Sequence, residues 1–390
     1  MTATAIGVPE PSDADEAPIL EMVDRFLERE VRPHARALEA ADEYPESIVA
    51  ALRELGFFGM TISPEYGGLG LSALTYAKVV ERVAAVWMSV TGFFNTHLIM
   101  AAAVERHSSE TMKRSYLPRF ATGELRGGIG LTEPDCGTDL QAVRTRAKRD
   151  NQGYVVDGSK TWITNSVHGD ILAVLVKTDP NTTPAHRGMS LLLIEKSDGF
   201  RVVRKLEKLG YRGIDTGEIV FDGCRVPAAN LIGEEGRGLQ IVLGGLELGR
   251  INVAARGAGM ARVCLEESLA YAQLRRTFGQ PIAEHQAIQL KLADMATRAR
   301  AAWLLVEDAA RAYDAGRRGG MEASMAKLFA TEAAMENSAE AVRIHGAYGY
   351  SREFNVERYY RDAPLLVIGE GTNEILRTVI ARDLVKRYPA

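Results

Sequence analysis

A glutamate between two glycines is the residue best placed to do chemistry in this chain. Glu370 lies between Gly369 and Gly371, after an apolar run that ends at Ile368 and before a predicted helix that starts at Thr372. Burial raises the pKa of a glutamate and makes its anion a stronger base. Glu370 is therefore the candidate residue for the chemistry of this chain.

Two segments offer contacts for a flat, polar ring. Residues 130–139 (GLTEPDCGTD) form a tight loop whose threonine hydroxyls and backbone N–H groups can bind a ring or an amide. In the predicted strand at 160–165 (KTWITN), Trp162 and Thr164 are two residues apart and therefore face the same side. A structural turn and a tryptophan of the β core explain these two segments equally well, so neither is decisive alone.

Two further segments suit phosphate groups. Residues 275–281 (RRTFGQP) end a long predicted helix, and arginine with threonine suits a phosphate, although the helix dipole alone explains the arginines. Thr372 opens the last helix, where free N–H groups favour an anion. No G-x-G-x-x-G follows a predicted strand, and residues 233–238 (GEEGRG) are acidic, so a nucleotide here is not held in a Rossmann domain.

The bulk composition narrows the partners. The 390 residues suffice for two or three domains, and the net charge of -4 argues against nucleic acid or an anionic membrane. The three cysteines are scattered without a C-x-x-C pair. This argues against a disulfide framework and against a structural zinc site, and it fits a protein of the reducing cytoplasm. H-E-x-x-H is absent, so we expect no catalytic metal. The N-terminal residues lack the pattern of a signal peptide, and no 18-residue apolar run predicts a membrane span.

Hydrophobic periodicity divides the chain into helical, β and helical parts. Helices are predicted at 19–55, 74–119, 241–277, 286–315, 321–344 and 372–386, and short strands at 154–156, 171–176, 189–194, 200–203 and 218–221. The strands predict a β-barrel or sandwich of about 110 residues, with Asp157-Gly158 as a two-residue hairpin turn. Met321, Met325, Leu328 and Phe329 are expected to form a buried stripe.

Together these segments resemble the acyl-CoA dehydrogenase family over residues 19–387. The motifs GLTEPDCGTD, WITN, LGYRGIDTGEIVFDGCRVPAANLIGEEGRG, RRTFGQPI and the segment 343–377 match the family in order and spacing. The resemblance implies an α+β, mostly α fold with an N-terminal α-helical domain, a middle β-barrel and a C-terminal four-helix bundle. The expected boundaries are a flexible N-terminus at 1–15 and domains at 16–124, 125–236 and 237–390.

The resemblance also implies the site residues, with Glu370 as the base and FAD as the cofactor. The implied flavin-ring contacts are Ile129, Leu131, Thr132, Thr138, Trp162, Ile163 and Thr164. Contacts to the rest of FAD are Arg275, Thr277, His285 and Gln286, reaching across a subunit boundary; Arg343, Gly346 and Ala347, from the neighbouring subunit; and Thr372 and Glu374, at the pyrophosphate. The implied substrate contacts are Thr138, Glu247, Arg250, Gly369 and Gly371, with looser pocket-lining positions at Thr91, Phe93, Phe94, Asn95, Leu243 and Gly244.

Three departures from the family pattern bear on function. Some members place the base on the helix that here carries Gly249, which has no side chain, so Glu370 is the base of the family type. Position 369 often holds tyrosine, and Gly369 should open the pocket to a short, branched or cyclic acyl group. Arg343 stands where glutamine is usual and Ala347 where glycine is usual, which puts the Arg343 contact in question.

The resemblance thus implies an FAD-dependent acyl-CoA dehydrogenase that acts as a homotetramer and passes electrons to an electron-transferring flavoprotein. The alternative is a same-fold flavoenzyme with another reaction, such as an oxidase, a flavin monooxygenase or a desulfinase relative. Several such relatives alter the base, so Glu370 favours dehydrogenation. A flavin-free scaffold with this fold is a third hypothesis, which a colourless purified protein would support.

Overall fold

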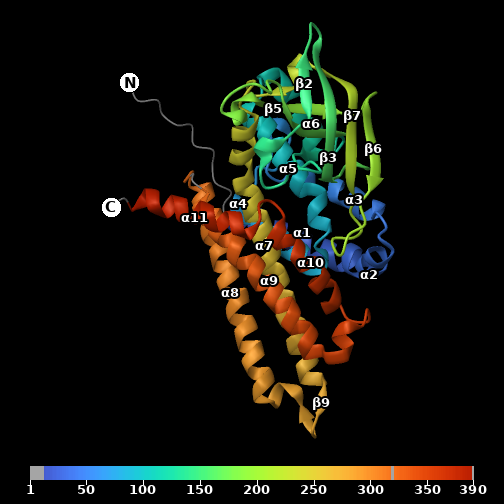
Figure 1. The fold of residues 1–390 in the computed structure, drawn as a ribbon. Coiled ribbons are helices and arrows are strands. Elements are labelled where there is room, and N and C mark those ends of the chain that lie inside the picture. Colours follow the sequence, from blue (N-terminus) through green and yellow to red (C-terminus); the bar gives the residue numbers. More distant parts are fainter. Residues whose placement is uncertain (1–12, 318–319, 389–390) are drawn as a thin grey trace.

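The N-terminal region of the computed structural model, which describes residues 13–317 and 320–388, is helical (Figure 1). Its helices are α1 (Asp13–Phe26), α2 (Arg32–Ala41), α3 (Glu46–Glu54), α4 (Ala73–Trp87), α5 (Val90–His107) and α6 (Glu110–Ala121), with a π-helical turn at Leu27–Val31. Pro33 lies in the first turn of α2, and Pro45 precedes α3, so the prolines interrupt the predicted helical stretch at helix starts. Of the flexible N-terminus predicted at 1–15, residues 1–12 lie outside the described residues, whereas residues 13–15 already belong to α1.

The middle region forms one hydrogen-bonded sheet. Its eight described strands are β1 (Gly127–Gly130), β2 (Arg146–Arg149), β3 (Gly153–Thr164), β4 (Ile171–Lys177), β5 (Met189–Glu195), β6 (Phe200–Lys205), β7 (Thr216–Pro227) and β8 (Leu231–Ile232). The order is β6-β7-β3-β2-β4-β5-β8, with β1 parallel to β4. Residues 171–176 and 189–194 are buried on both faces, which explains their unbroken apolar sequence.

The predicted hairpin at Asp157-Gly158 is wrong. Both residues lie inside the continuous strand β3, where the pairing with β7 shifts between Val156 and Gly158. Gly158 has φ +145°, and a Cβ there would lie 2.6 Å from the Cα of Thr145. The glycine therefore serves a β-bulge at a close approach of two backbones rather than a turn.

The C-terminal region is a helical bundle. Its helices are α7 (Gly238–Leu274), α8 (Gln286–Asp314), α9 (Met321–His345), α10 (Val356–Ile368) and α11 (Asn373–Arg387), and the short strands β9 (Arg276–Thr277) and β10 (Gln280–Pro281) form a tip between α7 and α8. Small residues let α7 and α9 approach closely, since a Cβ on Gly257 would lie 2.6 Å from the carbonyl oxygen of Ala330. Helix α10 was not predicted, although its buried residues Val356, Tyr359, Ala363 and Leu366 follow helical spacing.

The N-terminal helices connect the sheet to the bundle. Helix α5 contacts both β1 and α7, and α4 also packs against α7. The first half of α7 faces Ile99 of α5 through Gly245 and Gly249, and the loop between α10 and α11 meets α5 through the hydrogen bond from Asn95 to Glu370. In the described ranges, no helix combines the length and the apolarity needed to cross a membrane.

Candidate active site

The candidate base sits in the short loop between α10 and α11. The backbone of Glu370 has φ +53°, a left-handed conformation that is strained for a residue with a side chain. The Nδ2 atom of Asn95, on α5, donates a hydrogen bond of 2.6 Å to Glu370 Oε1. The Oε2 atom is buried and has no hydrogen-bond partner among the described residues. One oxygen of the carboxylate is thus fixed, while the other is left to accept a proton.

Gly249 of α7 makes room for this carboxylate. A Cβ added at Gly249 would lie 2.1 Å from Glu370 Oε2 and 3.0 Å from Ile99 Cδ1. Gly249 therefore has a steric role besides carrying no side chain that could act as a base, because any side chain there would displace the carboxylate of Glu370.

Burial dominates the electrostatics of Glu370. Loss of hydration raises the pKa of its carboxyl, and the positive charge of Arg256, the hydrogen bond from Asn95 and the charges of Lys327 and Arg250 lower it by less in total. Arg256 is itself buried and donates to Tyr211 Oη at 3.2 Å. A raised pKa with nearby positive charge suits a group that must take up a proton near neutral pH.

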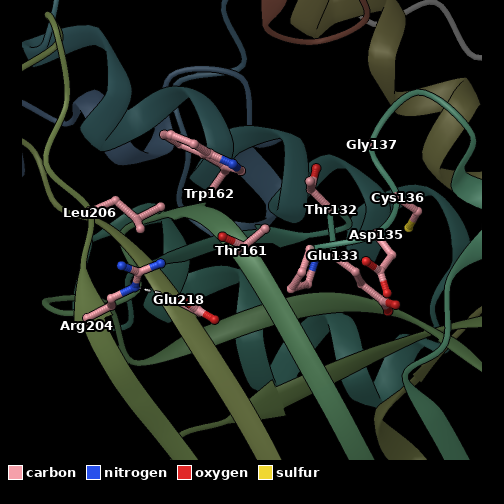
Figure 2. A pocket seen from close by; sticks show the side chains of 11 residues that line it. Thr132, Glu133, Asp135, Cys136, Gly137, Thr161, Trp162, Arg204, Leu206 and Glu218 are labelled. Atoms are coloured by element: carbon pink, nitrogen blue, oxygen red, sulfur yellow. Dashed lines mark hydrogen bonds and ion pairs between the residues drawn. The ribbon is translucent and has the colours of Figure 1, made fainter.

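A cavity of about 480 Å³ lies beside the loop that follows β1 (Figure 2). It is lined by Thr132, Glu133, Pro134, Asp135, Cys136, Gly137, Thr161, Trp162, Arg204, Leu206 and Glu218. Figure 2 shows Trp162 and Thr132 at its upper rim, with Arg204 and Glu218 on one side and Asp135 on the other.

Trp162 is the feature of this cavity that points to an aromatic ligand. Its side chain is 59% exposed and its backbone has φ +61°. Both the exposed indole ring and the left-handed backbone cost free energy. The neighbouring Ile163 is buried and Thr164 is half-buried, and the pairing with β7 shifts between Lys160 and Ile163, so Trp162 lies at an irregularity of the strand. The indole plane and the Thr132 hydroxyl fit a flat heteroaromatic ring.

A buried ion pair supports the loop of this cavity. Lys160 Nζ donates to Glu133 Oε1 at 2.8 Å and to the Leu131 carbonyl at 3.1 Å. Glu133 also accepts from the backbone N–H groups of Arg144 and Thr145 at 2.6 and 3.0 Å. Burial raises the pKa of Glu133, but the ion pair and these bonds outweigh it and the pKa is lowered. The loop is thereby tied to β3, two residues before Trp162.

The remaining predicted FAD contacts fall into two groups. Thr372 caps α11, accepting from the Ile375 N–H at 3.4 Å, and lies two residues after Glu370, with Glu374 exposed in the first turn. The other group lies at the far tip of the bundle, where β9 is drawn far from β3 (Figure 1). That group contains Arg275, Thr277, His285, Gln286, Arg343, Gly346 and Ala347.

Contacts at the tip hold this second group together. Thr277 Oγ1 and His285 Nε2 are 3.0 Å apart, and Tyr271 of α7 stacks on His345 of α9 with ring centroids 4.2 Å apart. The stack places the end of α9, with Arg343, beside the end of α7. A single chain therefore does not bring the tip group to the Trp162 cavity, and the expected subunit crossing of the tip residues remains a prediction.

The predicted substrate contacts lie on three segments, one of which is the loop between α10 and α11, where Gly369 and Gly371 flank Glu370. Thr138 is exposed on the loop after β1, and Glu247 and Arg250 are half-buried on α7. Arg250 Nη1 donates to Ser324 Oγ of α9 at 3.3 Å, and its charge acts on Glu370. The described residues contain no group of three His, Cys, Asp or Glu side chains placed to hold a metal ion.

The family models for three consecutive domains match nearly the whole chain. The acyl-CoA dehydrogenase N-terminal domain matches residues 13–124, the middle domain residues 128–224 and the C-terminal domain residues 236–385. The chain belongs to the acyl-CoA dehydrogenase family. It is therefore an oxidoreductase with FAD as its cofactor, and the predicted family, fold class and cofactor are confirmed.

Individual relatives agree over almost their whole length. An acyl-CoA dehydrogenase of Bacillus subtilis (strain 168) is 39% identical over 93% of this chain and 96% of the relative. A mitochondrial isovaleryl-CoA dehydrogenase of Oryza sativa subsp. japonica is 36% identical over 94% of this chain and 90% of the relative. The solved structure of butyryl-CoA dehydrogenase from Megasphaera elsdenii has a TM-score of 0.92 at 34% identity and covers 97% of this chain and 100% of that one.

Several residues that shape the site were not singled out from the sequence. Arg256, Lys327 and the pair Glu133–Lys160 are charged groups that the fold buries. The sequence did contain one signal for Lys327: it lies four residues after Ala323 and three before Ala330, which belong to the buried face of α9.

Proposed function

We propose that this acyl-CoA dehydrogenase oxidises the Cα–Cβ bond of an acyl-CoA thioester, with Glu370 as the base that removes the α-proton. The observation that carries the proposal is the carboxylate itself, with Oε1 held by Asn95 and Oε2 buried without a partner among the described residues. A base aimed in this way needs little reorganisation before proton transfer.

The chain's own groups perform the remaining steps of binding and charge stabilisation. The backbone N–H of Glu370 is the proposed donor to the thioester carbonyl, where negative charge develops as the α-proton leaves. Bound FAD would supply the hydride acceptor for the β-hydrogen, and the product would be a trans-2-enoyl thioester. The residues that would hold FAD here are Trp162 and Thr132 at the ring and Thr372 at the phosphates, together with the tip group around Arg275 from another subunit.

A short, branched or cyclic acyl group is the proposed substrate class. Gly369 has φ -70°, which any residue adopts, and a Cβ there would meet only the Leu365 carbonyl oxygen, at 3.2 Å, and Leu365 Cδ1, at 3.8 Å. The backbone therefore does not require glycine at 369, and the missing side chain leaves space beside the base. Two relatives described above carry names of short or branched substrates, isovaleryl-CoA and butyryl-CoA.

The proposed partners rest on the family resemblance and on the position of the tip group. We infer an assembly of several copies, because the tip group is far from the Trp162 cavity within one chain and Leu274 and Phe278 beside it are 81% and 99% exposed, and the resemblance makes the proposed assembly a homotetramer. An electron-transferring flavoprotein is the proposed acceptor, and the cytoplasm is the proposed location.

Replacing the base tests the proposal. Glu370→Gln should give a yellow, FAD-loaded protein that acyl-CoA does not bleach under anaerobic conditions, because an amide cannot take up the α-proton. The control is Glu353→Gln, an exposed carboxylate in the preceding loop, which should bleach like the parent protein. Undiminished bleaching in Glu370→Gln would refute the assignment, and turnover with oxygen in place of an artificial acceptor would indicate an oxidase.

A further inference from the structure

A buried lysine holds the loop that carries the candidate base. Lys327 of α9 has an exposed fraction of 0%. Its ammonium group donates to the Gly371 carbonyl at 2.8 Å, to Asn373 Oδ1 at 2.9 Å and to the Val367 carbonyl at 3.4 Å. These acceptors lie on both sides of Glu370, so one side chain bridges the end of α10 and the start of α11.

The acceptors of Lys327 are all uncharged. No ion pair recorded among the described residues involves this ammonium group, and burial lowers its pKa to about 8. A buried cation without a paired carboxylate costs free energy that an apolar side chain of similar size would avoid. Capping the last carbonyls of α10 offsets only part of that cost. The charge therefore needs a local explanation.

Glu370 supplies that explanation. Among the charges that act on Lys327, that of Glu370 is the largest, ahead of Arg250, Glu374 and Glu332. In return, Lys327 is one of the positive charges that favour the anion of Glu370. The lysine keeps its own charge at neutral pH, where the base has to be ionised.

We propose that Lys327 is a positioning residue for Glu370, which fixes the loop geometry of the base and stabilises its carboxylate anion. This inference rests on the proposed role of Glu370 as the base. It assigns two separable effects to one side chain, a mechanical effect through hydrogen bonds and an electrostatic effect through charge.

Two arginines also place positive charge near Glu370, but in the described part of the chain they, unlike Lys327, make no hydrogen bond to the loop that carries it. On α7, Arg256 is bonded to Tyr211 and Arg250 to Ser324, so neither is bonded to the loop. Tyr76 on α4 and Asn95 on α5 complete the surroundings, and the pKa of Tyr76 is raised mainly by burial.

Thr331 provides a matched control on the same helix. Its hydroxyl exchanges hydrogen bonds with the Asn373 side chain, at 3.0 and 3.3 Å, without carrying a charge. Thr331→Val therefore loosens the loop and leaves the electrostatics intact, whereas Lys327→Gln keeps a hydrogen-bond donor and removes the charge.

The test is the pH dependence of anaerobic flavin bleaching by a saturating acyl-CoA. Removing a positive charge raises the pKa of a neighbouring carboxyl, and the protonated form cannot act as a base. In Lys327→Gln the midpoint of the acid limb should therefore move up by about one pH unit. At a pH well below the midpoint, the bleaching rate divided by its plateau value should be about tenfold lower in the variant than in the parent protein. Thr331→Val should slow bleaching equally at every pH and keep the parent midpoint.

An unshifted midpoint in Lys327→Gln would overturn the inference, whatever its effect on the rate. If that variant does not accumulate with FAD, Lys327→Arg replaces it as the test, because it keeps the charge and alters the bonds. The expected result is then a slower reaction with the parent midpoint, and a displaced midpoint would count against us. Failure of the proposed function looks different, since either the parent protein would not bleach with any acyl-CoA or Glu370→Gln would bleach normally.

Discussion

At the scale of single residues, the site depends on the absence of a side chain as much as on the presence of one. The carboxylate of Glu370 occupies space that a Cβ at Gly249 would fill, since the two would be 2.1 Å apart. Asn95 and the left-handed backbone at Glu370 fix the carboxylate on its other side. Glycine in the middle of a long helix costs about 0.5–1 kcal/mol relative to alanine, so a local function must offset that cost.

Gly249→Ala tests this steric role. The added methyl group should push the flexible end of Glu370 away and lower the bleaching rate by about a hundredfold, because displacement of a catalytic group by about 1 Å has that effect. The unfolding temperature should stay the same or rise slightly, since alanine favours the helix. Gly245→Ala is the control, because a Cβ there meets only Ile99 Cγ2, at 3.8 Å. Equal activity in both variants would contradict the steric account.

Residue types pointed more clearly to the candidate base than to the side chains that hold it. Glu370 could be chosen from the sequence because a carboxylate between glycines is locally unusual. Asn95 and Lys327, which hold the base and its loop, are separated from it by 275 residues and by 40 or more, and no local pattern links such positions. Arg256 was equally invisible, because a charged residue in a helix is normally on its solvated face.

At the scale of elements, hydrophobic periodicity predicted most helices and the longer strands, but not helix α10, the short strands β1, β2 and β8, or the local irregularities. The hairpin predicted at Asp157-Gly158 proved to be a bulge, because the same dipeptide also suits a strand that must pass close to Thr145. Helix α10 was missed because Pro364 and alternating charges obscure its buried face. In α9, Phe329 is 39% exposed while Ala326, Lys327 and Ala330 are fully buried, so small residues rather than large ones mark the packed face.

Lys160 tests the connection between β3 and the loop after β1. Lys160→Met leaves the Glu133 carboxylate buried without its cation, which typically costs about 3–5 kcal/mol. The unfolding temperature should fall, and the loosened loop should raise the Kd for FAD by about tenfold, measured by titrating the flavin-free protein. Adding Glu133→Gln should recover part of the stability, because the buried charge is then gone. An additive double variant would show that the two side chains do not act as a pair.

At the scale of the whole molecule, the two groups of predicted FAD contacts are far apart within one chain (Figure 1). The Trp162 cavity lies beside the sheet, while Arg275, Thr277 and His285 lie at the tip of the bundle (Figure 1). The tip also exposes large apolar side chains, with Phe278 at 99% and Tyr350 at 91% exposure. Apolar surface on this scale marks an interface, and a second copy of the chain is the proposed partner.

Phe278→Asp tests whether assembly completes the FAD site. A charge at the tip should disfavour burial against another copy, so light scattering should show species smaller than the parent assembly. If the tip residues complete the site of another subunit, the smaller species should also lose FAD and its visible absorbance. Val203→Asp, at a 57% exposed position on the edge strand β6, is the matched control and should keep both assembly and colour. A dissociated Phe278→Asp protein that retains stoichiometric FAD would show that each chain binds its cofactor alone, and the tip group would then need another explanation.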